Sequence, residues 1–335
     1  MIPLERIHTM HYYLAPLEGI TGYHFRNVHH AMFPGTHKYF TPFRVACQDI
    51  GFRKKELTDL LPEHNEGVPV VPQILSNDAD AFLVAAKQLK DLGYSEINLN
   101  LGCPSGTVVA KYRGSGFLAL PRELDQFLEK VYSGIDLPLS IKTRIGLAQD
   151  DSFEELLEIY RKYPLSELIV HPRYGRDEYR GKADLMQFQI AYDHWDLPLC
   201  YNGDVTNVSV FEEIYSRFPE IDAVMIGRGC VTNPALIRTL ETGEGLTLPE
   251  FQAFHDKMYE TYSSFLSGDR NILFRMKELW NYFIFLFPDS KRQYKEIKKS
   301  QTCADFESAV SRLYRECDFD PATGFVGDTN KSSAV

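Results

Sequence analysis

Residues 96–104 read EINLNLGCP, and this stretch gives the clearest indication of both the fold and its chemistry. Its short apolar run predicts a β-strand that carries Asn100 and Cys103 at its carboxyl end. Pro104 and a loop containing glycine follow, which favours exposure of the Cys103 thiol at a rim. A lone cysteine is more often an inert buried thiol, so the loop after it is what singles Cys103 out.

Seven further short runs predict strands before and after this one, at Tyr12–Pro16, Lys38–Pro42, Val68–Leu75, Leu137–Arg144, Glu167–Arg173, Leu197–Asn202 and Ala223–Gly227. Several are continuously apolar, as in strands that are buried on both faces. Helical patterns lie between them at Asp78–Leu92, Ser152–Tyr163 and Val208–Phe218. This alternation predicts a parallel sheet, and eight strands within about 230 residues predict a closed (β/α)8 TIM barrel, an α/β fold.

The pattern changes near residue 240, after which no strand is predicted. Four helical segments follow, at Glu250–Phe265, Ile272–Leu286, Lys291–Ser300 and Asp305–Asp318. The sequence therefore predicts a barrel domain over residues 1–240 and a small all-helical domain over residues 241–320. Residues 321–335 are polar and contain glycine, and we expect them to form a disordered tail.

The composition restricts the class of protein. The chain has 335 residues, of which 44% are hydrophobic, and no run approaches the ~20 apolar residues of a membrane helix. The N-terminus shows no secretory signal, so we expect a cytoplasmic protein. The six cysteines are scattered and none forms a C-x-x-C pair, so neither a metal site nor a disulfide framework is expected. Nothing in the sequence requires an oligomer.

The charge distribution bears on possible partners. The formal net charge of −10 argues against a protein that coats nucleic acid unselectively. Residues 270–299 nevertheless carry eight basic and three acidic side chains, the basic ones being Arg270, Arg275, Lys277, Lys291, Arg292, Lys295, Lys298 and Lys299. A solvated helical face is the ordinary interpretation of such a run, and a surface that contacts phosphates is the functional one.

Polar residues follow most of the predicted strands, at the end of a barrel where sites lie. They are Pro16-Leu17-Glu18, Gln73, Asn100 with Cys103, Lys142 with Arg144, His171 with Arg173, Asn202-Gly203-Asp204 and Gly227-Arg228. An inward lysine at position 142 needs an anionic partner because an unpaired buried charge is costly. Glycine and arginine after the last strand lie where barrels commonly bind phosphate, which predicts an anionic cofactor.

Taken together, these motifs resemble the dihydrouridine synthase family. The resemblance covers Tyr12 to Asp318 and rests on APLEGIT, Gln73, NLNLGCP with the following GSG, KTR, HPR, NGD, MIGRG and the tail segment MKELWNY. Related flavin barrels such as dihydroorotate dehydrogenases share the phosphate end, but not the glycine-cysteine-proline loop followed by this tail. The resemblance implies an FMN-dependent enzyme that reduces uridine in RNA, most of all in tRNA, with NADPH (or NADH) as reductant.

The same resemblance implies a role for each motif residue. Pro16, Leu17 and Glu18 line the flavin through backbone atoms, Gln73 and Lys142 contact its ring, and His171 lies beside it. Asn202, Gly203 and Asp204 hold the ribityl chain and phosphate, and Gly227 with Arg228 holds the phosphate. Asn100 and Arg173 belong to the substrate side. Cys103 is the acid: hydride from flavin N5 reaches C6 of uracil, and a thiol of pKa near ~8.5 can give the proton to C5.

Some positions depart from the family pattern, and other functions stay open. Leu17 replaces a methionine, Arg44 follows the second strand where glutamate is expected, Leu185 replaces a tryptophan and Cys230 replaces a small residue. These departures leave the identity of the RNA open, with rRNA as a further possibility. One alternative is a flavin oxidoreductase that acts on a free pyrimidine or another small enone. Another is a flavin- or RNA-binding protein without catalysis, against which Cys103, Lys142 and His171 argue together.

Overall fold

The computed structural model describes residues 10–326 and contains one sheet in which every paired strand is parallel. The strand order is β3-β5-β6-β7-β8-β9-β10-β1-β2-β4. The strands are β1 His11–Leu14, β2 Lys38–Phe40, β3 Arg44–Val45, β4 Val70–Val71, β5 Gln73–Leu75, β6 Ile97–Leu101, β7 Leu139–Arg144, β8 Glu167–His171, β9 Leu199–Tyr201 and β10 Ala223–Ile226.

Prolines explain why ten strands appear where eight were predicted. Residues 41–43, with Pro42, separate β2 from β3, and Pro72 separates β4 from β5, because proline cannot donate to a ladder. Since β4 pairs with β2 and β5 pairs with β6, the chain through Pro72 joins the two ends of the sheet. Thr41 bridges the gap, with its Oγ1 accepting from the Gln73 N–H at 3.0 Å. The predicted eight-stranded barrel is thereby confirmed.

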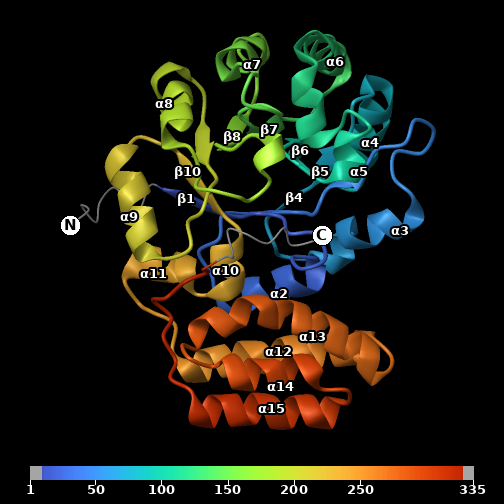
Figure 1. Cartoon of the computed structure of the whole chain (residues 1–335). Coiled ribbons are helices and arrows are strands. Elements are labelled where there is room, and N and C mark those ends of the chain that lie inside the picture. The colour runs from blue at the N-terminus through green and yellow to red at the C-terminus, as the bar shows by residue number, and fades with distance from the viewer. Residues whose placement is uncertain (1–9, 327–335) are drawn as a thin grey trace.

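Helices cover the outside of the barrel, as Figure 1 shows. They are α2 Tyr23–Met32, α3 Lys54–Leu57, α4 Ala79–Asp91, α5 Gly106–Val109, α6 Pro121–Gly134, α7 Phe153–Tyr160, α8 Leu185–His194, α9 Val208–Arg217, α10 Arg228–Thr232 and α11 Leu236–Thr242. Short 3₁₀ turns lie between them: η1 Thr58–Leu60, η2 Pro62–His64, η3 Gly114–Ala119 and η4 Gly175–Asp177. The predicted cap at Ser152 is confirmed, since its side chain accepts from the Glu155 N–H at 3.2 Å.

The barrel interior has its own small core, separate from the larger core beneath the helices. It consists of Tyr13, Ala15, Phe40, Val71, Ile169, Cys200, Ala223 and Met225. At the amino ends of the strands this core meets Lys38, which lies 2.8 Å from the Glu96 carboxylate, and Glu167, which accepts from the Tyr13 hydroxyl at 2.7 Å. Because this end is filled and its charges are paired, it has the character of a structural floor.

Four helices follow the barrel: α12 Leu248–Phe265, α13 Asp269–Phe283, α14 Lys291–Lys299 and α15 Cys303–Glu316, with η5 Ile284–Leu286 between α13 and α14. They stack below α2 in Figure 1. Phe254 of α12 packs edge-on against Phe25 and Phe33 of the barrel, with ring centroids 5.9 and 5.6 Å apart. The helical region is therefore joined to the barrel through an apolar contact around α2.

The predicted domain limits can be compared with these elements. Residue 240 lies inside α11, which ends at Thr242, and the next helix begins at Leu248. The assignment of separate domains stays a prediction. Residues 321–326, expected to belong to a disordered tail, have a defined place against the barrel, whereas residues 327–335 and the N-terminal residues 1–9 lie outside the described residues. Across residues 10–326, no helix combines the length and apolar character needed to cross a membrane.

Trp280 is expected to be a major source of stability for the helical region. It is fully buried, and its indole N–H donates to His255 Nε2 at 3.2 Å. Trp280→Ala should lower the free energy of unfolding by about 3–5 kcal/mol because it leaves a large cavity. Phe274 is the control on the same helix, being 59% exposed, and Phe274→Ala should change little. Urea unfolding followed by circular dichroism measures both; equal effects would contradict the expectation.

Candidate active site at the carboxyl end of the barrel

A chain of side-chain amides connects the barrel interior to the Cys103 loop. Asn98 donates to Ser140 Oγ at 2.9 Å and accepts from Gln73 Nε2 at 2.8 Å. Gln73 Oε1 in turn accepts from Asn100 Nδ2 at 2.6 Å. Asn100 Oδ1 then accepts the backbone N–H groups of Gly102 and Cys103 at 3.0 and 2.9 Å. The network fixes each amide orientation, so the turn that carries Cys103 is held by the barrel itself.

The glycine-rich segment after the loop supports Cys103 from the other side. The Cys103 carbonyl accepts from both the N–H and the hydroxyl of Ser115, each at 3.0 Å. Gly114 has a φ of +54°, and a Cβ there would lie 2.7 Å from the Cys103 oxygen. Arg144 adds a third support, since its Nε donates to the Gly102 carbonyl at 2.9 Å. Only glycine fits position 114.

The thiol of Cys103 is set up to stay protonated. The side chain is partly buried beside the barrel mouth, and burial raises the pKa of Cys103 above its usual range. The backbone N–H of Ser105 and the nearby Arg144 act in the opposite direction but do not outweigh burial. A protonated thiol can donate a proton and is a poor nucleophile.

Lys142 is the least satisfied charge in the site. It pairs in register with Asn100 and with Ile169 of the interior core, so its side chain lies on the inner face of the barrel. Within residues 10–326 its ammonium makes neither a hydrogen bond nor an ion pair, and burial, with a smaller contribution from Arg144, lowers the pKa of Lys142 to about 8. A cation in this position favours an anionic or hydrogen-bond-accepting ligand.

His171 lies on the neighbouring strand β8, in register with Arg144, and is surrounded by charged groups. Its Nε2 accepts from Arg173 Nη1 at 2.9 Å, so a neutral ring carries its proton on Nδ1. Burial and the surrounding cations hold the pKa of His171 well below its usual range. Arg173 and Arg228 both bind the carboxylate of Asp204, the latter at 3.0 Å. The mouth therefore carries more positive than negative charge.

Backbone groups lie close to these cations. A Cβ at Gly203 would come within 3.0 Å of Tyr201 and Ala183, and a Cβ at Gly227 would lie 3.2 Å from Leu17 Cδ1. α10 begins directly after Gly227, so the first N–H groups of this helix have no partner within it. Since neighbouring side chains fill the space beside both glycines, Arg228 is the group here that can hold an anion such as a phosphate.

Other predicted residues are partly occupied with the protein itself. Asn202 Nδ2 donates to the Met225 carbonyl at 2.8 Å, and the Leu17 N–H donates to Thr21 Oγ1 at 2.8 Å. Glu18 is half exposed, and its carboxylate lies 4.0 Å from Arg44. Pro16 is partly buried at the same rim. The structure thus gathers all the predicted residues at one mouth, while the roles assigned to them stay predictions.

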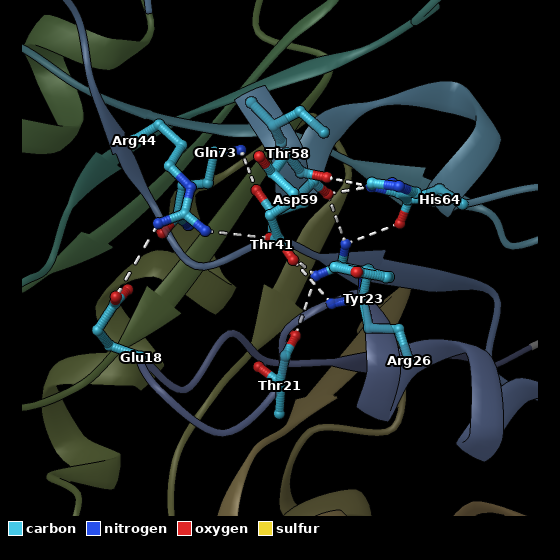
Figure 2. Close-up of polar contacts among 12 residues, drawn as sticks. Glu18, Thr21, Tyr23, Arg26, Thr41, Arg44, Thr58, Asp59, His64 and Gln73 are labelled. Atoms are coloured by element: carbon cyan, nitrogen blue, oxygen red, sulfur yellow. Dashed lines mark hydrogen bonds and ion pairs between the residues drawn. The ribbon is translucent and has the colours of Figure 1, made fainter. Parts of the chain in front are cut away.

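Figure 2 shows a cluster beside this mouth that the sequence did not reveal. Arg44 Nη2 lies 3.3 Å from the Asp59 carboxylate, which also binds the fully buried Arg26 at 3.2 Å and accepts the Tyr23 N–H at 2.7 Å. The one signal was Arg44 itself, which departs from the family pattern. Arg44 pairs in register with the outward-facing Ile74, so its side chain lies outside the barrel lumen. Its ion pairs with Asp59 and Glu18 connect segments of the rim.

Tyr179 is a second residue at the mouth that the sequence did not single out. Its ring is 45% exposed and lies 5.5 Å from the Arg144 guanidinium, 5.1 Å from that of Arg228 and 6.2 Å from the His171 ring. It comes from the loop between β8 and α8, where no periodic pattern marks a contact with distant strands. Within the described chain, no group of three or more His, Cys, Asp or Glu side chains is arranged to hold a metal ion.

Comparison with known proteins identifies the family. The family model described as dihydrouridine synthase (Dus) matches residues 13–314. The chain belongs to the dihydrouridine synthase family. Among curated members, tRNA-dihydrouridine synthase B of Pasteurella multocida is 28% identical over 69% of this chain and 68% of its own. The Shewanella oneidensis protein of the same name is 24% identical over 90% of this chain and 95% of its own.

Solved structures agree on the architecture. A variant of NCR from Zymomonas mobilis has a TM-score of 0.50 and 15% identity, over 72% of this chain and 90% of its own. At that identity the likeness shows the barrel fold alone. For this member of the synthase family, the fold is therefore supported by the sheet topology, by the family model and by the structural likeness independently.

Lys142 gives the site a measurable pH dependence. Because the folded pKa of about 8 lies below the usual 10.5, the unfolded chain binds the proton more tightly. Without cofactor, the free energy of unfolding should rise between about pH 8 and 10.5, by up to about 3 kcal/mol. Lys142→Met should be more stable at pH 7 and should lose this rise. Denaturant unfolding at a series of pH values measures it, and parallel profiles would refute the assignment.

Proposed function

We propose that this protein reduces uridine to 5,6-dihydrouridine in RNA, with FMN as the hydride donor and NADPH (or NADH) as the reductant of the flavin. The observation that carries the proposal is the Cys103 thiol. It is held at the barrel mouth by Asn100 and kept protonated by burial, beside the cations of that mouth. Curated family members are named tRNA-dihydrouridine synthases, so we propose tRNA as the substrate.

The residues at the mouth suit FMN. The ammonium of Lys142 has no hydrogen-bond or ion-pair partner among the described residues. An electron-rich flavin ring would provide one. Arg228 is partly exposed at the same mouth, and a guanidinium there suits the phosphate. Asp204 holds Arg173 and Arg228 in place. In this arrangement Gln73 and Lys142 would hold the isoalloxazine ring, and Arg228 would hold the phosphate.

When bound, reduced FMN supplies a hydride for C6 of uracil. The Cys103 Sγ–H then gives its proton to C5, and the resulting thiolate recovers a proton from water. Asn100 positions the acid through the two N–H bonds it accepts, and its own Nδ2 is taken by Gln73. Neutral His171 can donate from Nδ1 without adding positive charge. The target base has to leave its stack to reach a barrel mouth.

The helical region favours RNA over a free pyrimidine. α14 exposes Lys291, Arg292, Lys295, Lys298 and Lys299, so most of the basic stretch predicted from the sequence lies on solvent-facing surface. Lys298 is bound to Asn281 and Arg292 to Glu296, which leaves the other three for phosphate contacts. A small-enone reductase needs no such surface, because its substrate carries no backbone phosphates.

Cys103→Ala tests the assigned acid. The variant should keep its yellow flavin, because the backbone N–H groups at residues 102 and 103 remain. Dihydrouridine formation should fall roughly 10² to 10⁴-fold, the usual value of a positioned acid. Cys317→Ala is the matched control, since Cys317 lies at the end of α15 away from the mouth. Single-turnover assays with reduced enzyme and unmodified tRNA measure the rate.

This assay and two further experiments separate the possible functions. Full activity of Cys103→Ala would remove Cys103 as the acid. Nucleoside mass analysis of tRNA and rRNA from cells lacking the protein identifies the substrate by the dihydrouridine that is lost. Unchanged dihydrouridine in both RNAs would refute the RNA substrate and favour reduction of a small enone. A purified protein that stays colourless after incubation with FMN would refute the flavin mechanism.

A further inference from the structure

The last described segment of the chain returns from the helical region to the barrel. After α15, the Asp320 N–H donates to the Leu286 carbonyl at 2.8 Å, and the Pro321 carbonyl accepts from Asn233 Nδ2 at 3.2 Å. Gly324 has a φ of +68°, and any Cβ there would collide with the carbonyl of Thr206 in the loop after β9. Figure 1 shows this segment rising from α15 past α11 and α10. It is therefore seated on the barrel at defined points.

Phe325 stands at the end of this path, next to Arg228. Its ring centroid lies 4.9 Å from the Arg228 guanidinium carbon. The same ring packs against Phe285 at 4.8 Å and Tyr282 at 5.7 Å, both from the helical region. Arg228 also lies 5.1 Å from the Tyr179 ring, and its Nη2 donates to Asp204 at 3.0 Å. Three segments of the chain thus converge on one guanidinium.

An arginine side chain loses considerable freedom when it binds an anion, which costs binding energy. Aromatic rings against a guanidinium reduce that cost, because they hold it in place while its edge N–H groups stay available for hydrogen bonds. Asp204 fixes one of those groups, and the others remain for a ligand. The ring of Phe325 therefore restricts the Arg228 side chain.

We propose that Phe325 is a positioning residue of the cofactor site: it holds Arg228 ready for the phosphate of FMN and makes the C-terminal segment part of that site. The inference rests on the proposed function, in which Arg228 contacts the phosphate. Its effect should be confined to ligands that carry the phosphate. Because Phe325 also touches Tyr282 and Phe285, the segment connects the helical region to the cofactor end of the barrel.

The test compares FMN with riboflavin, which lacks the phosphate. Phe325→Ala should weaken FMN binding roughly threefold to thirtyfold, the range of a cation–π contact, and leave riboflavin binding unchanged. Phe325→Leu keeps an apolar side chain without a π-face and should behave like Phe325→Ala. Phe325→Trp keeps an aromatic face and should bind FMN with an affinity close to that of the wild type. Flavin fluorescence titrations of the apoprotein give each dissociation constant, with thermal unfolding to verify the fold of each variant.

Each outcome decides between the proposals. If Phe325→Ala bound FMN and riboflavin more weakly by the same factor, the role of Phe325 would be merely structural and the inference would be overturned. Unchanged FMN affinity in this variant would also overturn it. Tighter FMN binding in that variant would show that the ring blocks the site, which also overturns it. Failure of the wild-type protein to bind FMN would instead refute the proposed function. Phe274→Ala, on an exposed ring of α13, is the matched control and should bind both flavins like wild type.

Discussion

Excess positive charge at the barrel mouth is the constraint on which the rest of this structure depends. Lys142, Arg144, Arg173 and Arg228 converge there, and Asp204 is the carboxylate that binds two of them. Folding alone does not favour such a group of cations, because burying them costs solvation energy. An anionic ligand, as proposed, would balance the cost, and the neutral His171 avoids adding to it. The proposed cofactor would supply this negative charge.

Cys103, the proposed acid, is positioned by different means. Cys103 itself contributes only a thiol, and its place depends on the amide chain through Gln73 and Asn100 and on the glycine at position 114. These supports act on the backbone of the loop and do not involve the thiol of Cys103. The loop is thus held rigidly without its thiol. This agrees with the general requirement that catalytic groups be held in place before the substrate arrives.

The helical region is more than an appendage to the barrel. It packs on α2 through Phe254 and approaches the mouth through Tyr282. Its C-terminal continuation then reaches Arg228 through Phe325. The basic side chains that we propose to contact RNA and the segment that reaches Arg228 thus belong to one connected structure.

The sequence by itself determined the barrel and the end where its chemistry lies, because buried parallel strands have a clear apolar pattern and polar residues follow them. Cys103, Lys142 and Arg228 could be found in this way. Only the tertiary structure decided how Pro42 and Pro72 divide two strands, why Arg44 turns to Asp59, and that Tyr179 and Phe325 meet at Arg228. Such contacts join residues far apart in the chain, and no local periodicity records them.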